Sequence, residues 1–312
     1  MRLVTYKHHE KETVGVDFNE KYLIDILKLA GHRRFLRKLK TIETYTEMDM
    51  LDLIRGGETS LSEIKTAISI LNDILNEEKG ERELKGSGVL LEKRSVKITA
   101  PIKRPPMILC QARNYLDHAG ESKYPTPKEP AIFAKAPTAI IGPDDHIIYP
   151  KMSKSIAHEI ELAVIIGKKG RNLTRNQALD AVFGYAVFND VTARDLQVRD
   201  IKEIKPWSFM PKSFDTFAPI GPCIVTKDQI GDPNDLKMEL RVNGETKQSS
   251  NTKNMIFKIP DIVQYISAFM TLLPGTIIAT GTPRGIGPLH PGDVVEAEIE
   301  RIGILKNTVV SE

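Results

Sequence analysis

The chain has 312 residues, 41% of them hydrophobic, so it can form one large domain or a large and a small one. Its 44 basic and 41 acidic residues are mixed along the sequence and leave a net charge of only +3, which argues against nucleic acid as the main partner. No apolar stretch approaches the roughly 20 residues needed to cross a bilayer, and the N-terminus lacks the apolar segment of a signal peptide. Two cysteines, Cys110 and Cys223, show no zinc-site spacing and fit a reducing compartment. We therefore expect a cytoplasmic protein without a membrane partner.

The N-terminal region is predicted to contain a hairpin and two helices. Residues 2–18 have the pattern of a short hairpin, and a helix is expected from Asn19 to Ala30. A stronger helix is expected to begin at Ser60, because Ser60 and Glu63 have the spacing of a capping box.

The segment Asn76–Gly88 is charged, contains glycine and has no periodicity, which is typical of a linker. We therefore expect a small α/β N-terminal domain, with its linker, at residues 1–95. Residues 96–312 are then expected to form a second, larger domain.

After the linker, the pattern changes to short strands separated by Pro and Gly. The expected strands are RSVKIT, MILCQA, AIFAKA, HIIYP, IELAVIIG, YAVFNDVT, GPCIVT, KMELRVNGE, TIIATGT and DVVEAEIE. The clearest helices are NQALDAVFG and IPDIVQYISAFMTL, and Asn243-Gly244 is a strong hairpin signal. The predicted fold class is α+β, predominantly β.

Two carboxylates stand at the start of the apolar run IELAVIIG. Glu159 and Glu161 are two residues apart, so on a strand they share a face and repel each other at the edge of a core. Asp190 follows another apolar strand, and three carboxylates from two strand ends usually hold a hard cation such as Mg²⁺. The alternative is a solvated strand end whose acids pair with Lys or Arg. His158 faces the opposite way and is expected at the surface or behind the ligands.

A second candidate pair lies upstream in RNYLDHAGE. His118 and Glu121 share one face of a helical turn, where a carboxylate can orient an imidazole that acts as a general base. The alternative is an exposed charge pair. The glycine-rich TGTPRGIGP lacks the Lys of a phosphate loop, and no GxSxG segment indicates a serine hydrolase.

Taken in order, these segments resemble the fumarylacetoacetate hydrolase family. The resemblance runs from about residue 101 to the end, over RNYLDHAGE, IFAK, EIELAVIIGKKGRN, GYAVFNDVTARDLQ, KSFDTFAPIGP, VNGE, NTKNMIF, LLPGTIIATGTPRGIGP and PGDVVEAEIERIG. It implies a mixed β-roll or β-sandwich catalytic domain with a small helical N-terminal domain, usually in a homodimer.

The resemblance also assigns residues to a site. It implies Mg²⁺, with Mn²⁺ or Ca²⁺ as alternatives, bound by Glu159, Glu161 and Asp190. The implied catalytic residues are His118, Glu121 and Lys212. The implied substrate contacts are Arg194, Gln197 and Thr282.

What this family does narrows the expected chemistry. Its members hydrolyse, decarboxylate, isomerise or dehydrate 2-oxo acids, which implies an Mg²⁺-dependent enzyme acting on a small 2-oxo acid through a metal-stabilised enolate. The His118–Glu121 pair favours C–C bond hydrolysis of an acylpyruvate or a fumarylacetoacetate-like β-diketone. The open alternatives are isomerisation or decarboxylation of a 2-hydroxy-dienedioate, as in homoprotocatechuate-type aromatic degradation, and dehydration of a 2-keto-3-deoxy sugar acid. A metal-binding scaffold without activity is disfavoured because the set of site residues is complete.

Overall fold

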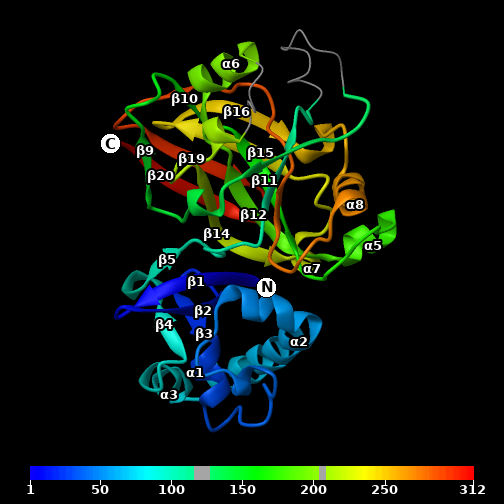
Figure 1. Ribbon diagram of the computed structural model, residues 1–312. Helices are drawn as coiled ribbons and strands as arrows, with labels where there is room; N and C mark the ends of the chain where they lie inside the picture. Colours follow the sequence, from blue (N-terminus) through cyan, green and yellow to red (C-terminus); the bar gives the residue numbers. More distant parts are fainter. Residues whose placement is uncertain (116–126, 204–208) are drawn as a thin grey trace.

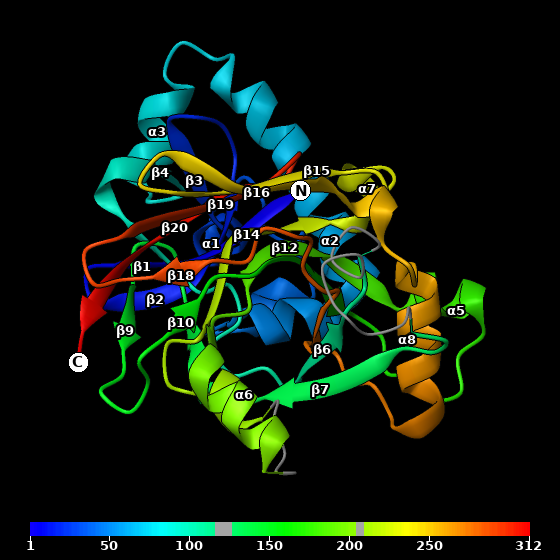
Figure 2. The same cartoon turned by 90° about the horizontal axis from the view of Figure 1, so that it is seen from above.

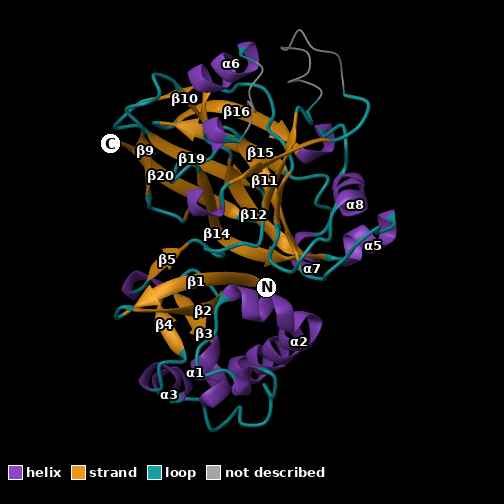
Figure 3. Ribbon diagram, viewed as in Figure 1, coloured by secondary structure: helices purple, strands orange, loops and turns teal. Residues whose placement is uncertain are grey.

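The computed structural model describes residues 1–115, 127–203 and 209–312, and strands dominate it (Figures 1 and 3). Within these ranges the largest sheet has 12 strands. They are β1 (Arg2–His8), β2 (Lys11–Asp17), β3 (Tyr22–Asp25), β4 (Leu90–Glu92), β5 (Lys97–Thr99), β6 (Ile108–Ala112), β7 (Ala131–Lys135), β8 (Ile140–Ile141), β11 (Ile160–Ile166), β12 (Val182–Asn189), β14 (Ala218–Thr226) and β17 (Ile277–Ala279). The order across the sheet is β4-β3-β2-β1-β14-β12-β11-β17-β6-β7, with β5 beside β1 and β8 beside β14.

Two smaller sheets complete the strand framework. One is β13-β10-β18 and the other is β16-β15-β19-β20-β9. Their strands are β9 (His146–Tyr149), β10 (Ile156–Ala157), β13 (Thr192–Ala193), β15 (Lys237–Val242), β16 (Glu245–Asn251), β18 (Pro288–Leu289), β19 (Val294–Ile299) and β20 (Gly303–Ser311). The strands expected from residue 95 onward are thus confirmed.

The main core lies between the large sheet and the five-stranded sheet. Strands β15, β19 and β20 pack against β11, β12 and β14, so two sheets face each other as in a sandwich or roll. Every residue of β11 and β12 is buried, which explains why both sequences are almost continuously apolar. The predicted class, α+β and predominantly β, is confirmed.

The helices lie at the margins of the sheets. In the described ranges the α-helices are α1 (Ile26–Gly31), α2 (Met50–Leu75), α3 (Gly80–Gly86), α5 (Arg175–Asp180), α6 (Arg194–Lys202), α7 (Lys227–Ile230) and α8 (Ile259–Phe269). Helices α5 and α8, both expected from the sequence, lie side by side at one flank (Figure 2). None of the described helices is both long enough and apolar enough to cross a membrane.

The Asn243-Gly244 hairpin forms as expected between β15 and β16. Both residues have positive φ angles, 53° and 80°, as the tight turn requires. This turn fixes the register of β16, which carries a residue that matters for the site below.

The helix expected from Asn19 to Ala30 is wrong in its first half. Residues Tyr22–Asp25 form β3, which pairs with β2, and only α1 is helical. The Asn19 side chain accepts from the backbone N–H of Tyr22, at 2.8 Å, and makes a turn instead of capping a helix. On its other side β3 pairs with β4, which is distant in sequence, with Tyr22 opposite Glu92. Strand pairing on both sides therefore overrides the local helical pattern.

The start expected for the second helix is also wrong. Helix α2 begins at Met50, after a capping box between Asp49 and Asp52, and is kinked at Gly57. Glu63 does not cap Ser60, because its carboxylate accepts from the backbone N–H of Thr41, at 3.1 Å. Ser60 is buried within the helix.

The expected linker Asn76–Gly88 is not irregular, because it contains α3 with the buried Leu84. Strands β1 to β4 lie at the bottom of Figure 1, yet they belong to the large sheet, since Leu3 of β1 pairs with Ile224 of β14. The β5 strand, beyond residue 95, also pairs with β1. The division at residue 95 stays a prediction.

Candidate active site

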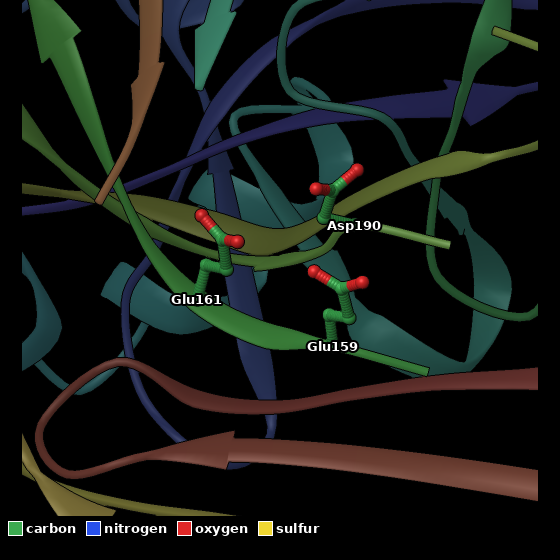
Figure 4. Close-up of side chains that lie close together, drawn as sticks. All are labelled: Glu159, Glu161 and Asp190. Carbon is green, nitrogen blue, oxygen red and sulfur yellow. The ribbon is translucent and has the colours of Figure 1, made fainter. Parts of the chain in front are cut away.

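The three predicted metal ligands come together at the ends of two paired strands. Glu159 precedes β11, Glu161 lies on it, and Asp190 follows β12; the two strands pair with Ile160 opposite Asn189. One carboxylate oxygen from each acid lies within 4.8 Å of the others, and all three residues are buried (Figure 4). The acids therefore lie as the sequence predicted.

Backbone hydrogen bonds hold this corner rigid. The N–H of Asp190 donates to the carbonyl of Glu159 at 2.8 Å, and the Asn189 side chain accepts from the N–H of Glu159 at 2.9 Å. The Glu159 carboxylate also accepts from the Thr192 hydroxyl at 2.9 Å. These hydrogen bonds fix the backbone of Glu159 and Asp190, and so they fix where the two carboxylates lie.

Three cations from the described part of the chain surround the acids. The Lys212 ammonium donates to Glu159 at 3.1 Å and also to Asp190, while Lys135 pairs with Asp190 and Arg194 pairs with Glu159. The alternative expectation, acids paired with Lys or Arg, is therefore right for two of the three acids, although none of them is solvated. The predicted catalytic Lys212 is itself only 3% exposed.

Glu161 differs from the other two acids. Among the described residues it has no cationic partner, and its carboxylate accepts from the backbone N–H of Gly281 at 2.7 Å. Burial, together with the charges of Asp190 and Glu159, raises the pKa of Glu161 well above its usual range. An all-oxygen set with one uncompensated buried carboxylate fits a divalent cation such as Mg²⁺ or Mn²⁺.

The other charges follow from the same contacts. Burial alone would raise the pKa of Asp190, but Lys135 and Lys212 outweigh burial and lower it. Burial would lower the pKa of Lys212, but Asp190 and Glu159 outweigh burial and raise it. Burial lowers the pKa of Lys135. Asp190 and Lys212 are therefore held in their charged forms.

The predicted substrate contacts lie around this cluster. Arg194 begins α6, and its guanidinium donates both to Glu159 and, at 2.7 Å, to the Gln197 amide oxygen. Thr282 follows β17 in the TGTPRGIGP segment, and its hydroxyl accepts from Gln248 at 2.9 Å. The predicted dyad His118 and Glu121 lies outside the described residues.

Glycine is required where this segment meets the predicted metal ligands. Gly281 has a φ of +96°, and a Cβ there would lie 2.7 Å from the Cβ of Asn114. The Asn114 amide holds the segment by donating to the carbonyl of Thr280 at 2.7 Å. Because the chain can approach this closely, the N–H of Gly281 reaches Glu161.

Several residues of the site were not singled out from the sequence. Lys135, Thr192 and Gln248 contact predicted site residues directly. Of these three residues, only Lys135 had a sequence signal that could have marked it as part of the site, because it is a lysine at the end of the apolar strand AIFAK. His158 is not at the surface: it is fully buried behind Glu159, and its Nδ1 lies 3.0 Å from the Gln248 amide oxygen.

Comparison with known proteins decides the family. The family model described as fumarylacetoacetate (FAA) hydrolase C-terminal matches residues 107–310, well over half of the chain. This chain belongs to the fumarylacetoacetate hydrolase family. The family that the sequence resembles is therefore confirmed, and so is the prediction that the protein is an enzyme.

Three relatives illustrate the range of reactions in the family. A mitochondrial oxaloacetate tautomerase of Rattus norvegicus is 40% identical over 99% of this chain and 92% of its own length. The structure of maleylpyruvate hydrolase from Sphingobium sp. SYK-6, with manganese(II) and pyruvate, has a TM-score of 0.77 and 31% identity, covering 100% of this chain and 99% of the other. The 2-hydroxyhepta-2,4-diene-1,7-dioate isomerase of Mycobacterium marinum has a TM-score of 0.72 and 30% identity, with the same coverage. All three are similar to this chain over nearly its full length.

Proposed function

We propose that this protein is a divalent-metal-dependent enzyme that interconverts the keto and enol forms of a small 2-oxo dicarboxylic acid, with oxaloacetate as the first candidate. The supporting observation is the buried triad of acids, in which Glu161 has no cationic partner among the described residues. The rat relative, similar over almost the whole chain, favours tautomerisation over the C–C hydrolysis that the sequence suggested first. A homodimer and a cytoplasmic location remain predictions.

The carboxylates of Glu159, Glu161 and Asp190 would hold the cation. When bound, a divalent cation supplies Lewis-acid stabilisation of the negative charge that develops on the oxygen of a 2-oxo group. Mg²⁺, which the sequence led us to expect, is the first candidate cation. Mn²⁺ is the alternative, because this all-oxygen set of ligands also suits it.

The chain's own cations would orient the substrate. Lys212 is buried, with its ammonium 5.0 Å from the centre of the Phe133 ring, so it presents a fixed positive charge beside the acids. The Arg194 side chain is 30% exposed, so its guanidinium can contact Glu159 and also meet a carboxylate arriving from solvent. Together they favour a substrate with two negative charges, and they stabilise the enolate oxygen more than the neutral 2-oxo group from which it forms.

Proton transfer is assigned to the predicted pair of His118 and Glu121. A carboxylate beside an imidazole sets its orientation and raises its basicity, so His118 would remove a proton from the carbon next to the 2-oxo group and return it. These residues are placed by sequence resemblance and lie outside the described part of the chain.

C–C hydrolysis is the second candidate. The similarity to maleylpyruvate hydrolase favours it, and the same His118 could instead activate water on a carbonyl. The two reactions differ in product, because hydrolysis of an acylpyruvate releases pyruvate and an acid whereas tautomerisation releases nothing.

The test starts from the enol form of oxaloacetate and follows the loss of its ultraviolet absorbance on dilution into water. We expect acceleration by the wild type with Mg²⁺ or Mn²⁺, none after chelation, and none by Glu159→Gln. The control is Glu245→Gln, at a side chain that is 75% exposed, which should behave as wild type. A parallel assay with an acylpyruvate measures pyruvate. No acceleration with either metal would reject tautomerisation, and pyruvate release alone would select hydrolysis.

A further inference from the structure

The side chain of Gln248 connects three separate parts of the site. It lies on β16 and is 1% exposed. Its amide oxygen is 3.1 Å from the backbone N–H of Ile160 and 3.0 Å from Nδ1 of His158. Its amide nitrogen is 2.9 Å from the Thr282 hydroxyl and 2.9 Å from the carbonyl of Pro283. All four hydrogen-bonding positions of one buried amide are therefore occupied.

Two of these partners fix which way the amide points. The N–H of Ile160 can only donate and the carbonyl of Pro283 can only accept, so the oxygen of Gln248 must face Ile160 and the nitrogen must face Pro283. The nitrogen of Gln248 therefore donates to Thr282, and the oxygen accepts from His158.

This orientation determines what the Thr282 hydroxyl can do. Since its oxygen accepts from Gln248, its own proton remains available, and it donates to no other described residue. A hydroxyl held in this way is a donor, and donors recognise anions. A Thr282 hydroxyl pointing its proton at Gln248 would instead offer only lone pairs, which repel a carboxylate.

Close packing keeps this segment against β16. Gly285 has a φ of +91°, and a Cβ there would lie 2.2 Å from the carbonyl oxygen of Lys247, the residue before Gln248. The segment from Thr282 to Gly285 therefore sits directly on the strand that carries Gln248.

We propose that Gln248 is a positioning residue that holds the Thr282 hydroxyl as a hydrogen-bond donor to the carboxylate of a 2-oxo acid. Through Ile160, the same amide also fixes the backbone between the ligands Glu159 and Glu161. This inference rests on the proposed function, because it requires a carboxylate-bearing substrate at Thr282.

The test is calorimetric titration of oxalate, a dianion that resembles the enolate of a 2-oxo acid, into the Mg²⁺-loaded protein. The variants are Gln248→Glu, Thr282→Val, Thr282→Ser and the double variant Gln248→Glu/Thr282→Val. Gln248→Glu keeps an acceptor for Ile160 but loses the two N–H donors. Gln229→Glu on α7, an exposed position, is the matched control for the added charge.

We expect Gln248→Glu and Thr282→Val each to weaken oxalate binding about 10-fold, because each removes the oriented donor to a charged group. Thr282→Ser, which keeps the hydroxyl, should stay within about 3-fold of wild type. The double variant should be no weaker than Thr282→Val alone, since both changes remove one interaction. KM for the 2-oxo acid should rise in step with these losses, while Gln229→Glu changes nothing.

Additive losses in the double variant, about 100-fold in total, would overturn the inference, because Gln248 would then act through its charge or through general packing. Wild-type binding by Thr282→Val would also overturn it, and this result does not depend on whether the Gln248 variant folds. Thermal melting of each variant identifies any unfolded protein. Failure of the wild type itself to bind oxalate would reject the proposed function and this inference together.

Discussion

The side chains of Lys135 and Asp190 form an ion pair in which neither has any exposed surface. The Lys135 ammonium also donates to the carbonyl of Val191 at 3.1 Å, so it is held by the backbone that follows β12. A buried charge is tolerated only when it is paired and hydrogen-bonded. The position of one predicted metal ligand is therefore tied to the stability of the fold.

Replacing Lys135 with Met should lower the free energy of unfolding by about 3 kcal/mol, because Asp190 would lose one of the two buried cations that pair with it in the described part of the chain. Urea unfolding of the metal-free protein measures the change. Lys97→Met is the control, since Lys97 and Asp145 pair at the surface with side chains 58% and 33% exposed. Lys97→Met should lower the free energy of unfolding by less than about 1 kcal/mol. Equal effects of the two changes would contradict the importance of the buried pair.

In the metal-free protein, Glu161→Gln should raise the free energy of unfolding at neutral pH. The pKa of Glu161 is raised in the folded state by burial, Asp190 and Glu159, so the folded protein holds a proton there that the unfolded chain releases. Stability of the wild type therefore falls as the pH rises from about 4.3, the ordinary Glu value, to the raised folded pKa. Glutamine does not titrate, so the gain in stability of the variant over the wild type should grow as the pH rises from about 4.3.

Urea unfolding over a series of pH values measures this difference. Adding Mg²⁺ should reverse the order at neutral pH, because only the wild type can offer three carboxylates to the cation, and ligand binding to the folded state stabilises it. A difference between variant and wild type that stays constant with pH would rule out the raised pKa.

Gly281→Ala should cost more stability than Gly292→Ala, although both glycines have a φ of +96°. A Cβ at Gly292 meets nothing within 4 Å, so that change carries only backbone strain of about 1 kcal/mol. At Gly281 the Cβ would also clash with Asn114, which should add about 2 kcal/mol. Only Gly281→Ala should weaken Mg²⁺ binding, because only its N–H donates to Glu161. Thermal melting and Mg²⁺ titration measure the two effects, and identical melting losses would exclude the clash.

His118→Ala should spare Mg²⁺ binding and reduce turnover by about 10²-fold or more, as expected for loss of an acid–base group. Calorimetry with Mg²⁺ and the enol assay separate the two properties. Turnover equal to that of the wild type would remove His118 from the mechanism and leave the proton transfer to a residue of the described cluster.

The acidic triad could be predicted because its cause is local. Two-residue spacing on a strand places Glu159 and Glu161 on one face, and an apolar strand that ends in Asp190 brings the third acid to the same edge. The strands that were expected after residue 95, and the expected helices α5 and α8, follow equally local patterns. The family resemblance then named the residues around the triad.

What could not be predicted depends on contacts between distant segments. Gln248 lies 88 residues from Ile160 in sequence, and no periodicity connects them. Lysine at a strand end is normally solvated, so the burial of Lys135, which depends on its ion pair with Asp190 at the end of another strand, could not be predicted from the sequence. The same cause contributed to the error at Tyr22–Asp25, where pairing with the distant β4 as well as with β2 replaced the expected helix.

The continuity of the large sheet has a consequence for shortened forms of the chain. Removing residues 1–95 would strip β1 from β14 and leave the hydrogen-bonding groups of Ile224 and Val225 without their neighbouring strand. Both side chains are almost fully buried, so the new edge would be apolar and unpaired, the kind of strand that recruits another chain. The N-terminal strands therefore cover an edge that could otherwise pair with another chain, and residues 96–312 alone should self-associate unless another strand covers that edge.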